Sequence, residues 1–563
     1  MTTTTQTDTI DELLSQAAAC LEEQRYLKAR KLCEKVLAKD PRNAPAHMLI
    51  AGVLEGRKDV KGAIESYRKA VECDPNHFPS WVNMGVCLKQ AGTLYQAIEA
   101  FETALKLDPD SLIVQYNLAR SLFECNRMVE AIDVFKSVLK QRPGWAEVQF
   151  NLGLAYQRLG HQDEALVHHR QAVDLKPDYP AARTELAHGL QAQGKFDEAL
   201  GHLRTALDSG PEYGRAHYLL AAMHPAGDAA RDEMALLDRH LGTDGLPAHA
   251  RMNMHYAAAS LCDQAEDYDR AFEHCRNAND LFKRDFGVST ETAAQSFRNV
   301  RDMFTPALYE RHAERRSSDP KTVLVGGLAR SGLTLVEQII STHPDAAVAG
   351  ELVGFMEDEH SVESGSDRTE KFQDTLSDYT GEDLNKLAGR YLDAVPARAS
   401  DARLVTDRVS HAHGRLGLAA LMFPTAKVIL CRRDPMDLCW SSYFTCMPER
   451  MGYTCDLRDL ATISTHHRKL MDHWAAALPN PVLEVHYERL VAEPEQEIRR
   501  IVEFLELDWN ADCLSFQEKG GSVSSPCFWE VRQPIFETSV GKWKRYEQHL
   551  DALKAGLRAE APL

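Results

Sequence analysis

The chain has 563 residues, of which 44% are hydrophobic and 26% charged, the balance of an ordinary globular protein. This length predicts about three or four domains, unless a repeat array takes up much of the chain. The formal net charge of −18 argues against general nucleic-acid binding, which needs a basic surface.

Residues 1–9 are polar and threonine-rich, and we expect them to form a flexible N-terminus. They lack the charged and apolar regions of a signal peptide. No stretch of the chain reaches the roughly 18 apolar residues that would span a bilayer. The thirteen cysteines form no C-x-x-C pair, which is typical of free thiols in a reducing compartment. These features predict a cytoplasmic protein without a transmembrane segment.

Residues 10–213 repeat with a period of 34 residues. The clearest unit has Trp81 and Gly85 on a first helix, Ala97 and Phe101 on a second helix, and a proline at its end. Five further units carry the same pattern in register, so we predict six tetratricopeptide (TPR) hairpins. Such hairpins stack into an all-α superhelical solenoid with a concave face. We expect the groove to bind a protein or peptide, and a homodimer is an open alternative.

The period fails after the sixth unit, and residues 214–319 are predicted to contain irregular helices and a charged connector. Within them, residues 251–285 are predicted to form an additional TPR-like helix pair. Pro320 marks the next boundary. In residues 320–563, short apolar strands alternate with helices, which indicates an α/β domain with a parallel sheet and ligands at the strand ends. The predicted strands are residues 323–325, 403–406, 428–431 and 482–486.

Residues 321–351 combine a strand, a glycine-rich turn and a helix. Two glycines have the spacing of the nucleotide-binding loop G-x-x-x-x-G-K-[ST], and Thr334 takes the place of its last residue. The lysine of that loop is replaced by Leu333, and the cation comes earlier, at Arg330. A turn that leads into a helix N-terminus binds anions. This arrangement suits a terminal phosphate or phosphosulfate better than a magnesium-bound triphosphate.

Residues 329–335 read A-R-S-G-L-T-L and resemble the 5′-phosphosulfate loop P-[RK]-S-G-T-T-L of the sulfotransferase superfamily. The resemblance covers essentially the whole chain, because bacterial TPR–sulfotransferases also join repeats to a P-loop sulfotransferase fold. It implies that the sulfonate donor is 3′-phosphoadenylyl sulfate and that no metal is needed. The loop residues implied to bind this donor are Arg330, Ser331, Gly332, Leu333 and Thr334.

A second motif, V-I-L-C-R-R-D-P-M-D-L-C-W-S-S, places Arg433 after a strand and Ser441 eight residues later. An arginine and a hydroxyl can share one phosphate, although a helix-capping Arg–Asp pair would also fit. The motif resembles the family's 3′-phosphate site, which implies that these two residues hold that phosphate. The family resemblance also implies an adenine-side contact at Tyr487, in a Y-E-x-L segment. Ser525 and Lys542 are further candidate phosphate contacts, in a C-terminal segment that resembles that of the bacterial proteins.

Glu351 follows Arg330 by 21 residues, after an H-P pair and a glycine. This spacing resembles that of the tyrosylprotein sulfotransferases, which implies that Glu351 is the general base. A carboxylate can take the acceptor's proton if its pKa is raised toward the working pH, whereas a helix-capping glutamate is the structural alternative. Arg408 stands where the family carries lysine, which implies a cation at the bridging oxygen of the donor. His411 is the alternative base.

The motifs together predict a sulfotransferase that moves a sulfonate group from 3′-phosphoadenylyl sulfate to an acceptor hydroxyl, with protein tyrosine as the favoured acceptor. Its predicted catalytic residues are Glu351, Arg408 and Arg330. A TPR interaction scaffold with a degenerate transferase domain is the alternative, because Ala329, Leu333 and Arg408 depart from the family pattern. A nucleotide kinase is a third possibility, against which the missing lysine counts.

Overall fold

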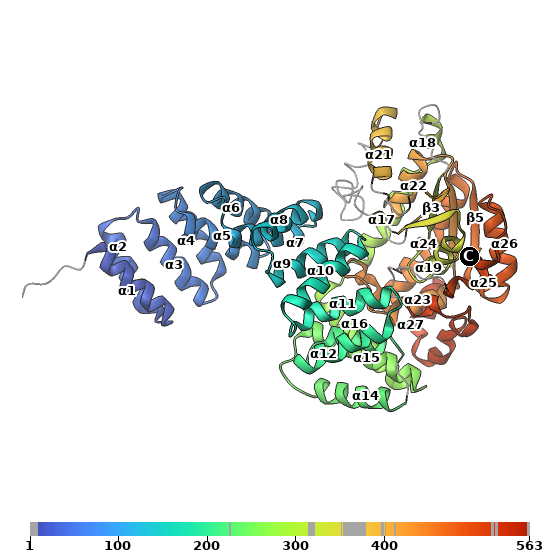
Figure 1. Cartoon of the computed structure of the whole chain (residues 1–563), viewed down its shortest axis with the longest axis horizontal. Coiled ribbons are helices and arrows are strands. Elements are labelled where there is room, and N and C mark those ends of the chain that lie inside the picture. Colours follow the sequence, from blue (N-terminus) through green and yellow to red (C-terminus); the bar gives the residue numbers. More distant parts are fainter. Residues whose placement is uncertain are drawn as a thin grey trace, which may run out of the picture. The chain divides into compact units, whose positions relative to one another are not determined.

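The structure is a computed structural model that describes residues 9–224, 227–312, 321–350, 352, 376, 379–393, 395, 399, 401–409, 413–518, 523 and 527–559. It divides into two compact units, Met1–Pro177 and Asp178–Leu563. Helices make up the described part of the first unit, and the described strands all belong to the second (Figure 1). None of the helices that the structure describes combines the length and the apolar character needed to cross a bilayer.

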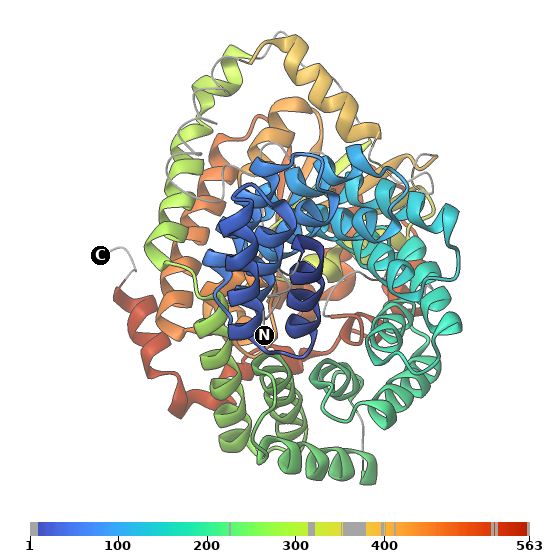
Figure 2. The same ribbon diagram turned by 90° about the vertical axis from the view of Figure 1, so that its left-hand side faces the viewer.

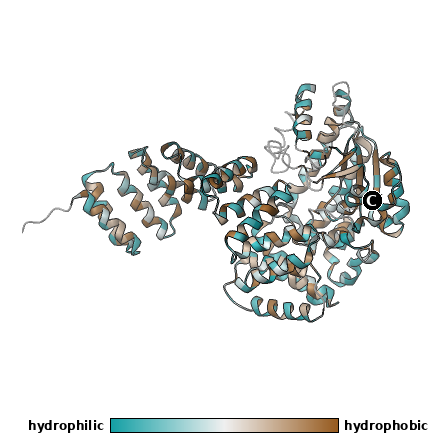
Figure 3. Cartoon of the chain, in the orientation of Figure 1, coloured by the Kyte–Doolittle hydropathy of each residue, from teal (hydrophilic) through white to brown (hydrophobic). Residues whose placement is uncertain are grey.

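The first unit consists of antiparallel helix pairs. Each pair has small residues where its helices cross: a Cβ atom added at Gly85 would lie 2.6 Å from the ring of Phe101, which is fully buried. Successive helices lie side by side (Figure 2), and hydrophobic and hydrophilic residues are mixed along them (Figure 3). The helices are α1 (Ile10–Glu22), α2 (Tyr26–Lys39), α3 (Ala44–Gly56), α4 (Val60–Cys73), α5 (Phe78–Gln90), α6 (Leu94–Leu107), α7 (Leu112–Glu124), α8 (Met128–Gln141), α9 (Ala146–Arg158) and α10 (Gln162–Leu175).

The second unit begins with the sixth hairpin of the repeat and continues as further helices. A pair of long antiparallel helices, α15 and α16, follows the shorter α13 and α14 and packs on the α/β part of the same unit. The helices before the sheet are α11 (Pro180–Ala192), α12 (Phe196–Ser209), α13 (Gly214–Ala221), α14 (Asp228–Leu241), α15 (Ala248–Gln264), α16 (Tyr268–Phe286), α17 (Thr290–Met303) and α18 (Pro306–Arg311).

A five-stranded parallel sheet with the order β2-β3-β1-β4-β5 forms the centre of the α/β part. The predicted fold class, an all-α repeat region followed by a parallel α/β domain, is therefore confirmed. The strands are β1 (Thr322–Gly326), β2 (Ala346–Gly350), β3 (Leu404–Val409), β4 (Lys427–Arg432) and β5 (Val482–His486). Strand β2 was not predicted, because its sequence A-A-V-A-G lacks the β-branched run that marked the other strands.

Helices cover both faces of the sheet, so β1 is buried along its whole length. Val323 and Val325 pack with helices α19 and α26 on one face, whereas Leu324 packs with α22 and α24 on the other. Because all strands are parallel, their carboxyl ends share one edge, and the strand order reverses beside β1 at that edge. The helices after the strands are α19 (Leu333–Thr342), α21 (Gly381–Asp393), α22 (His413–Met422), α23 (Pro435–Tyr443), α24 (Leu457–Ala477), α25 (Tyr487–Ala492), α26 (Pro494–Phe504) and α27 (Asp551–Ala559).

Short 3₁₀ helices complete the chain between these elements. Four of them lie near the C-terminus, between α26 and α27, where the chain runs past the carboxyl edge of the sheet. The 3₁₀ helices are η4 (Glu449–Cys455), η5 (Ala511–Glu518), η6 (Glu530–Arg532), η7 (Glu537–Ser539) and η8 (Lys542–His549).

Candidate active site

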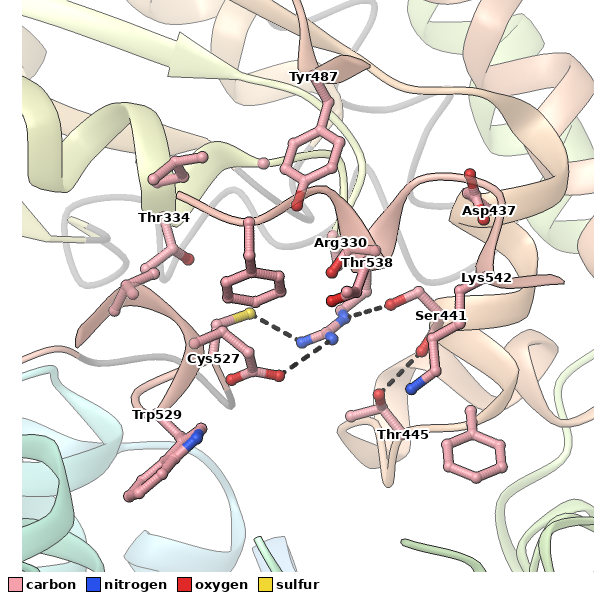
Figure 4. Close-up of a pocket in the computed structure, with 18 of the residues that line it drawn as sticks. Arg330, Thr334, Asp437, Ser441, Thr445, Tyr487, Cys527, Trp529, Thr538 and Lys542 are labelled. Atoms are coloured by element: carbon pink, nitrogen blue, oxygen red, sulfur yellow. Dashed lines mark hydrogen bonds and ion pairs between the residues drawn. The ribbon is translucent and has the colours of Figure 1, made fainter. Parts of the chain in front are cut away.

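A cavity of about 550 Å³ opens at the carboxyl edge of the sheet. The segments after β1, β4 and β5 and the end of β3 supply one side of its lining, and the C-terminal 3₁₀ segments supply another (Figure 4). Helices α13 and α15 complete the lining with Tyr218, Tyr256 and Asp263. The cavity therefore lies where parallel α/β folds bind their ligands.

The glycine-rich loop after β1 has the backbone conformation of an anion cradle. Arg330 has a φ of 73° and Gly332 a φ of 100°, and α19 starts directly after them. A Cβ atom at Gly332 would lie 2.8 Å from the ring of Tyr487, so only glycine fits there. The Oγ of Ser331 is buried and has no hydrogen-bond partner among the described residues. A buried hydroxyl without a partner costs free energy that a bound phosphate oxygen would recover.

Arg330 joins three distant parts of the chain. Its Nε donates to Ser441 Oγ at 2.8 Å, its Nη1 donates to Cys527 Sγ at 2.8 Å, and its Nη2 lies 3.8 Å from a Glu530 carboxylate oxygen (Figure 4). Burial by itself lowers the pKa of Arg330, but Cys527, Glu530, Tyr218 and Tyr487 together raise that pKa above its usual value. The guanidinium is therefore a permanent, nearly buried cation at the cavity.

Arg433 lies beside Arg330 and is held mainly by backbone carbonyls. Its Nη1 donates to the Arg330 carbonyl and its Nη2 to the Ser539 carbonyl, both at 2.8 Å. The guanidinium stacks 4.5 Å from the ring centre of Tyr487. Its Nε is buried and has no hydrogen-bond partner in the part of the chain that the structure describes. Burial lowers the pKa of Arg433, because a buried charge loses its contacts with water. An anionic ligand could supply the hydrogen bond that the Arg433 Nε lacks among the described residues.

Lys542 lines the same cavity, and in Figure 4 its amine lies near Ser441 and Thr445. Its Nζ forms an ion pair with Asp263 of α15 at 2.7 Å. The structure thus places the sequence-predicted cation at the cavity but pairs it with a carboxylate from a helix before the sheet, a contact that the sequence motif did not indicate.

Arg408, at the end of β3, is buried against the loop helix. Its Nη1 donates to Glu337 at 2.9 Å and lies 3.5 Å from Thr334 Oγ1. Arg408 is 7% exposed and Glu337 is 3% exposed, so the pair is an internal salt bridge next to the loop. Sequence reasoning missed Glu337, although its position three residues after Thr334 places both on one side of α19.

Three sequence-predicted residues, Glu351, His411 and Ser525, lie outside the described residues. Leu352, which follows Glu351, donates its backbone N–H to the Asp407 carboxylate at 3.1 Å. The same carboxylate accepts a hydrogen bond from the Tyr391 hydroxyl at 2.9 Å. This carboxylate joins the end of β2 to β3, one residue before Arg408.

Several residues at the cavity carried no sequence signal as ligands or supports. Asp437 accepts the backbone N–H groups of Gly541 and Trp543, at 2.6 and 3.4 Å, and so fixes the start of η8. Cys527 and Glu530 contact Arg330, as described above. Their roles depend on contacts between segments about 100 or more residues apart, which no local motif encodes.

The cations and hydroxyls at the cavity have the chemistry that binds phosphate groups. The cations that line the cavity include Arg330, Arg408, Arg433 and Lys542, and the hydroxyls of Thr334 and Ser441 lie among them. Within the described residues, no group of three or more His, Cys, Asp and Glu side chains is arranged to hold a metal ion. Charged donors of this kind form short, charge-assisted hydrogen bonds to phosphate oxygens.

Comparison with known protein families identifies two regions of the chain. Residues 320–511 match the model of the sulfotransferase family, and residues 21–84, 88–152 and 158–223 match that of the tetratricopeptide repeat. The chain therefore combines a TPR region with a domain of the sulfotransferase family, as the sequence motifs predicted.

Individual relatives are distant. An "Uncharacterized protein" of Aquifex aeolicus (strain VF5) is 30% identical over 329 residues, which are 57% of this chain and 43% of that protein. This chain therefore spans less than half of that relative's length. Protein-tyrosine sulfotransferase 1 of Danio rerio is 26% identical over 285 residues, or 48% of this chain and 78% of that protein. Among solved structures, MamA matches with 26% identity and a TM-score of 0.28, over 28% of this chain and 94% of that chain.

Proposed function

We propose that the chain is a sulfotransferase that uses 3′-phosphoadenylyl sulfate as its donor. The observation that carries the proposal is the meeting of Arg330, Ser441 and Arg433 at one cavity. Beside them lies the buried Oγ of Ser331, which has no hydrogen-bond partner among the residues that the structure describes. These groups come from the ends of two neighbouring strands and can bind two phosphate groups of one nucleotide. The match of residues 320–511 to the sulfotransferase family supports the same donor.

The residues would divide the donor between them. Arg330, Ser331 and the backbone N–H groups of the loop would hold the 5′-phosphate, and Arg433 with Ser441 would hold the 3′-phosphate. Tyr487, which already stacks on Arg433, would lie beside the adenine end. Lys542 would bind a phosphate oxygen, either by breaking its ion pair with Asp263 or while keeping it. Ser525 is a further candidate contact.

In the proposed reaction the acceptor oxygen attacks the donor's sulfur in line. The bond between that sulfur and the bridging oxygen breaks, adenosine 3′,5′-bisphosphate leaves, and the acceptor's proton goes to Glu351, with His411 as the alternative base. Arg408 would stabilise the negative charge that develops on the bridging oxygen. Glu337 holds Arg408 against the loop helix, close to Thr334, and so keeps this cation next to the phosphate cradle.

Protein tyrosine is our favoured acceptor, because the spacing of Arg330 and Glu351 resembles that of tyrosylprotein sulfotransferases and because one relative carries that name. A peptide in the groove of the TPR hairpins is the partner that we propose for residues 10–213, in a cytoplasmic enzyme whose catalytic domain is residues 320–563. The interaction scaffold is the second candidate, favoured by Leu333, which removes a hydroxyl from the loop.

A turnover assay tests the proposal. The full chain is incubated with 3′-phosphoadenylyl sulfate and, separately, a tyrosine peptide, a simple phenol and a sugar alcohol, and release of adenosine 3′,5′-bisphosphate is followed. Arg433→Ala should abolish turnover. Arg432→Ala is the matched control. Arg432 is the last residue of β4, next to Arg433, but its side chain pairs with Asp472 and Glu484 away from the cavity. Donor binding without turnover on any acceptor would favour the scaffold.

A further inference from the structure

The described residues 527–549 form a segment that we name the C-terminal strap. It contains η6, η7 and η8 and crosses the donor side of the cavity. Near its start, Cys527 and Glu530 contact Arg330. In its middle, the Ser539 carbonyl accepts from Arg433. Further on, Gly541 and Trp543 donate to Asp437, as described above. The strap therefore touches both of the arginines assigned to the donor phosphates.

The start of the strap is anchored on the sixth hairpin of the TPR region. The ring of Phe196, the first residue of α12, lies 5.0 Å from that of Trp529 and 6.4 Å from that of Phe528. Arg532 donates to the carbonyl of Ala192, at the end of α11, at 2.6 Å. In Figure 4, Trp529 lies next to the teal helices of this region.

The far end of the strap is anchored on the α15–α16 pair. Asp263 accepts from Lys542 Nζ at 2.7 Å and from the Tyr546 hydroxyl at 2.5 Å. The ring of His549 stacks on Phe272 with 4.3 Å between the ring centres. Both ends of the strap are thus fixed to helices that precede the sheet in the chain, and its start and middle also contact the donor arginines.

The start of the strap has almost no core of its own. Its buried apolar residues, Phe528 and Val531, form a small cluster with Val523, and this cluster is packed against Phe196 and Ala222 from the helical region. Three-residue 3₁₀ turns such as η6 have little intrinsic stability. The position of Cys527 and Glu530, and through them that of Arg330, therefore depends on the surface that α12 and α13 present.

We propose that Phe196 is a positioning residue of the donor site. It touches neither the loop nor the proposed donor; it holds Trp529 and Phe528, and the strap in turn holds the Arg330 guanidinium. The last TPR hairpin is then a structural part of the catalytic pocket as well as a member of the repeat. This inference concerns the donor site of the proposed function, but the contacts that carry it are present without any ligand.

Hydrogen–deuterium exchange on the full chain without ligand tests the inference. In Phe196→Ala, amides in residues 527–533 and in the loop, residues 327–335, should exchange at least about tenfold faster than in the wild type. The reason is that the free energy of local opening falls when the anchor is removed. Tyr26→Ala is the matched control: Tyr26 is also half-buried and also begins the second helix of its hairpin, in the first repeat. It should leave both segments unchanged.

Arg532→Gln provides a second variant, which weakens the same anchor without removing an aromatic side chain and so guards against misfolding of Phe196→Ala. Faster exchange of the loop in both variants supports the proposal. Faster exchange of residues 527–533 with an unchanged loop would overturn it, since the strap would then be a passive cover. No change in either segment would also overturn it. Failure of the wild type to bind adenosine 3′,5′-bisphosphate would reject the proposed function. The exchange experiment would still test whether Phe196 positions the strap and the loop, because it uses no ligand.

Discussion

Substituting Gly332 with alanine should damage the donor loop in two separable ways. The backbone there has a φ of 100°, which costs an L residue about 1–2 kcal/mol. The added Cβ would also lie 2.8 Å from Tyr487, and overpacking of this kind costs about 1–3 kcal/mol. We therefore expect the unfolding free energy of the second unit to fall by about 2–5 kcal/mol, measured by thermal or urea denaturation followed by circular dichroism.

Gly245→Ala separates the two costs. Gly245 has a φ of 90° in an exposed turn of the same unit, and a Cβ atom there would meet nothing within 4 Å. This control should therefore show the backbone cost alone. At about 2 °C per kcal/mol for a unit of this size, Gly332→Ala should melt about 2–6 °C below Gly245→Ala. Equal melting temperatures would refute the argument, because the Tyr487 ring would then not restrict the loop.

Three further predictions concern the proposed base, a donor cation and the pH dependence of stability. Glu351→Gln should lower turnover by about 100-fold or more with donor-product affinity unchanged; unchanged turnover would move the base to His411. Lys542→Met should weaken binding of adenosine 3′,5′-bisphosphate by about tenfold, which corresponds to the loss of one charge-assisted hydrogen bond. Substitution of the exposed Lys544 with methionine is the control and should leave the affinity unchanged. Equal affinities of the two variants would show that Lys542 is not part of the site. Burial, with a smaller effect of a nearby arginine, lowers the pKa of His467 to about 3, so the unfolded chain takes up the proton first and stability should fall as the pH drops below about 6.5. Urea midpoints at pH 7 and pH 5 should differ less in His467→Gln than in the wild type, and an equal difference would contradict this assignment.

The repeat and most of the sheet could be predicted because their signals are local. A period of 34 residues and small residues at helix crossings define the hairpins, and apolar β-branched runs marked β1, β3, β4 and β5. Strand β2 could not be predicted, because A-A-V-A-G has neither the alternation nor the side chains of a strand. It is a strand because β3 provides a parallel partner for its backbone.

The candidate site divides in the same way. Arg330, Arg433 and Ser441 carry motifs with fixed spacing at strand ends, and the structure brings them together. Glu337 carried a weaker signal, one helical turn from the loop, but only the fold shows that Arg408 reaches it. The contacts of Phe196 with the strap join segments that are far apart in the sequence, and such contacts depend on tertiary packing that local patterns do not encode.

The most direct test of the central claim is calorimetric titration of the full chain with adenosine 3′,5′-bisphosphate, beside ATP with magnesium. The account predicts micromolar or tighter binding of the bisphosphate, about −8 kcal/mol. That binding should be lost in Arg433→Ala and kept in Arg432→Ala, and it should be tighter than binding of ATP. Folded protein that binds no bisphosphate, or that binds ATP with magnesium in its place, would contradict the assignment of the cavity to a phosphosulfate donor.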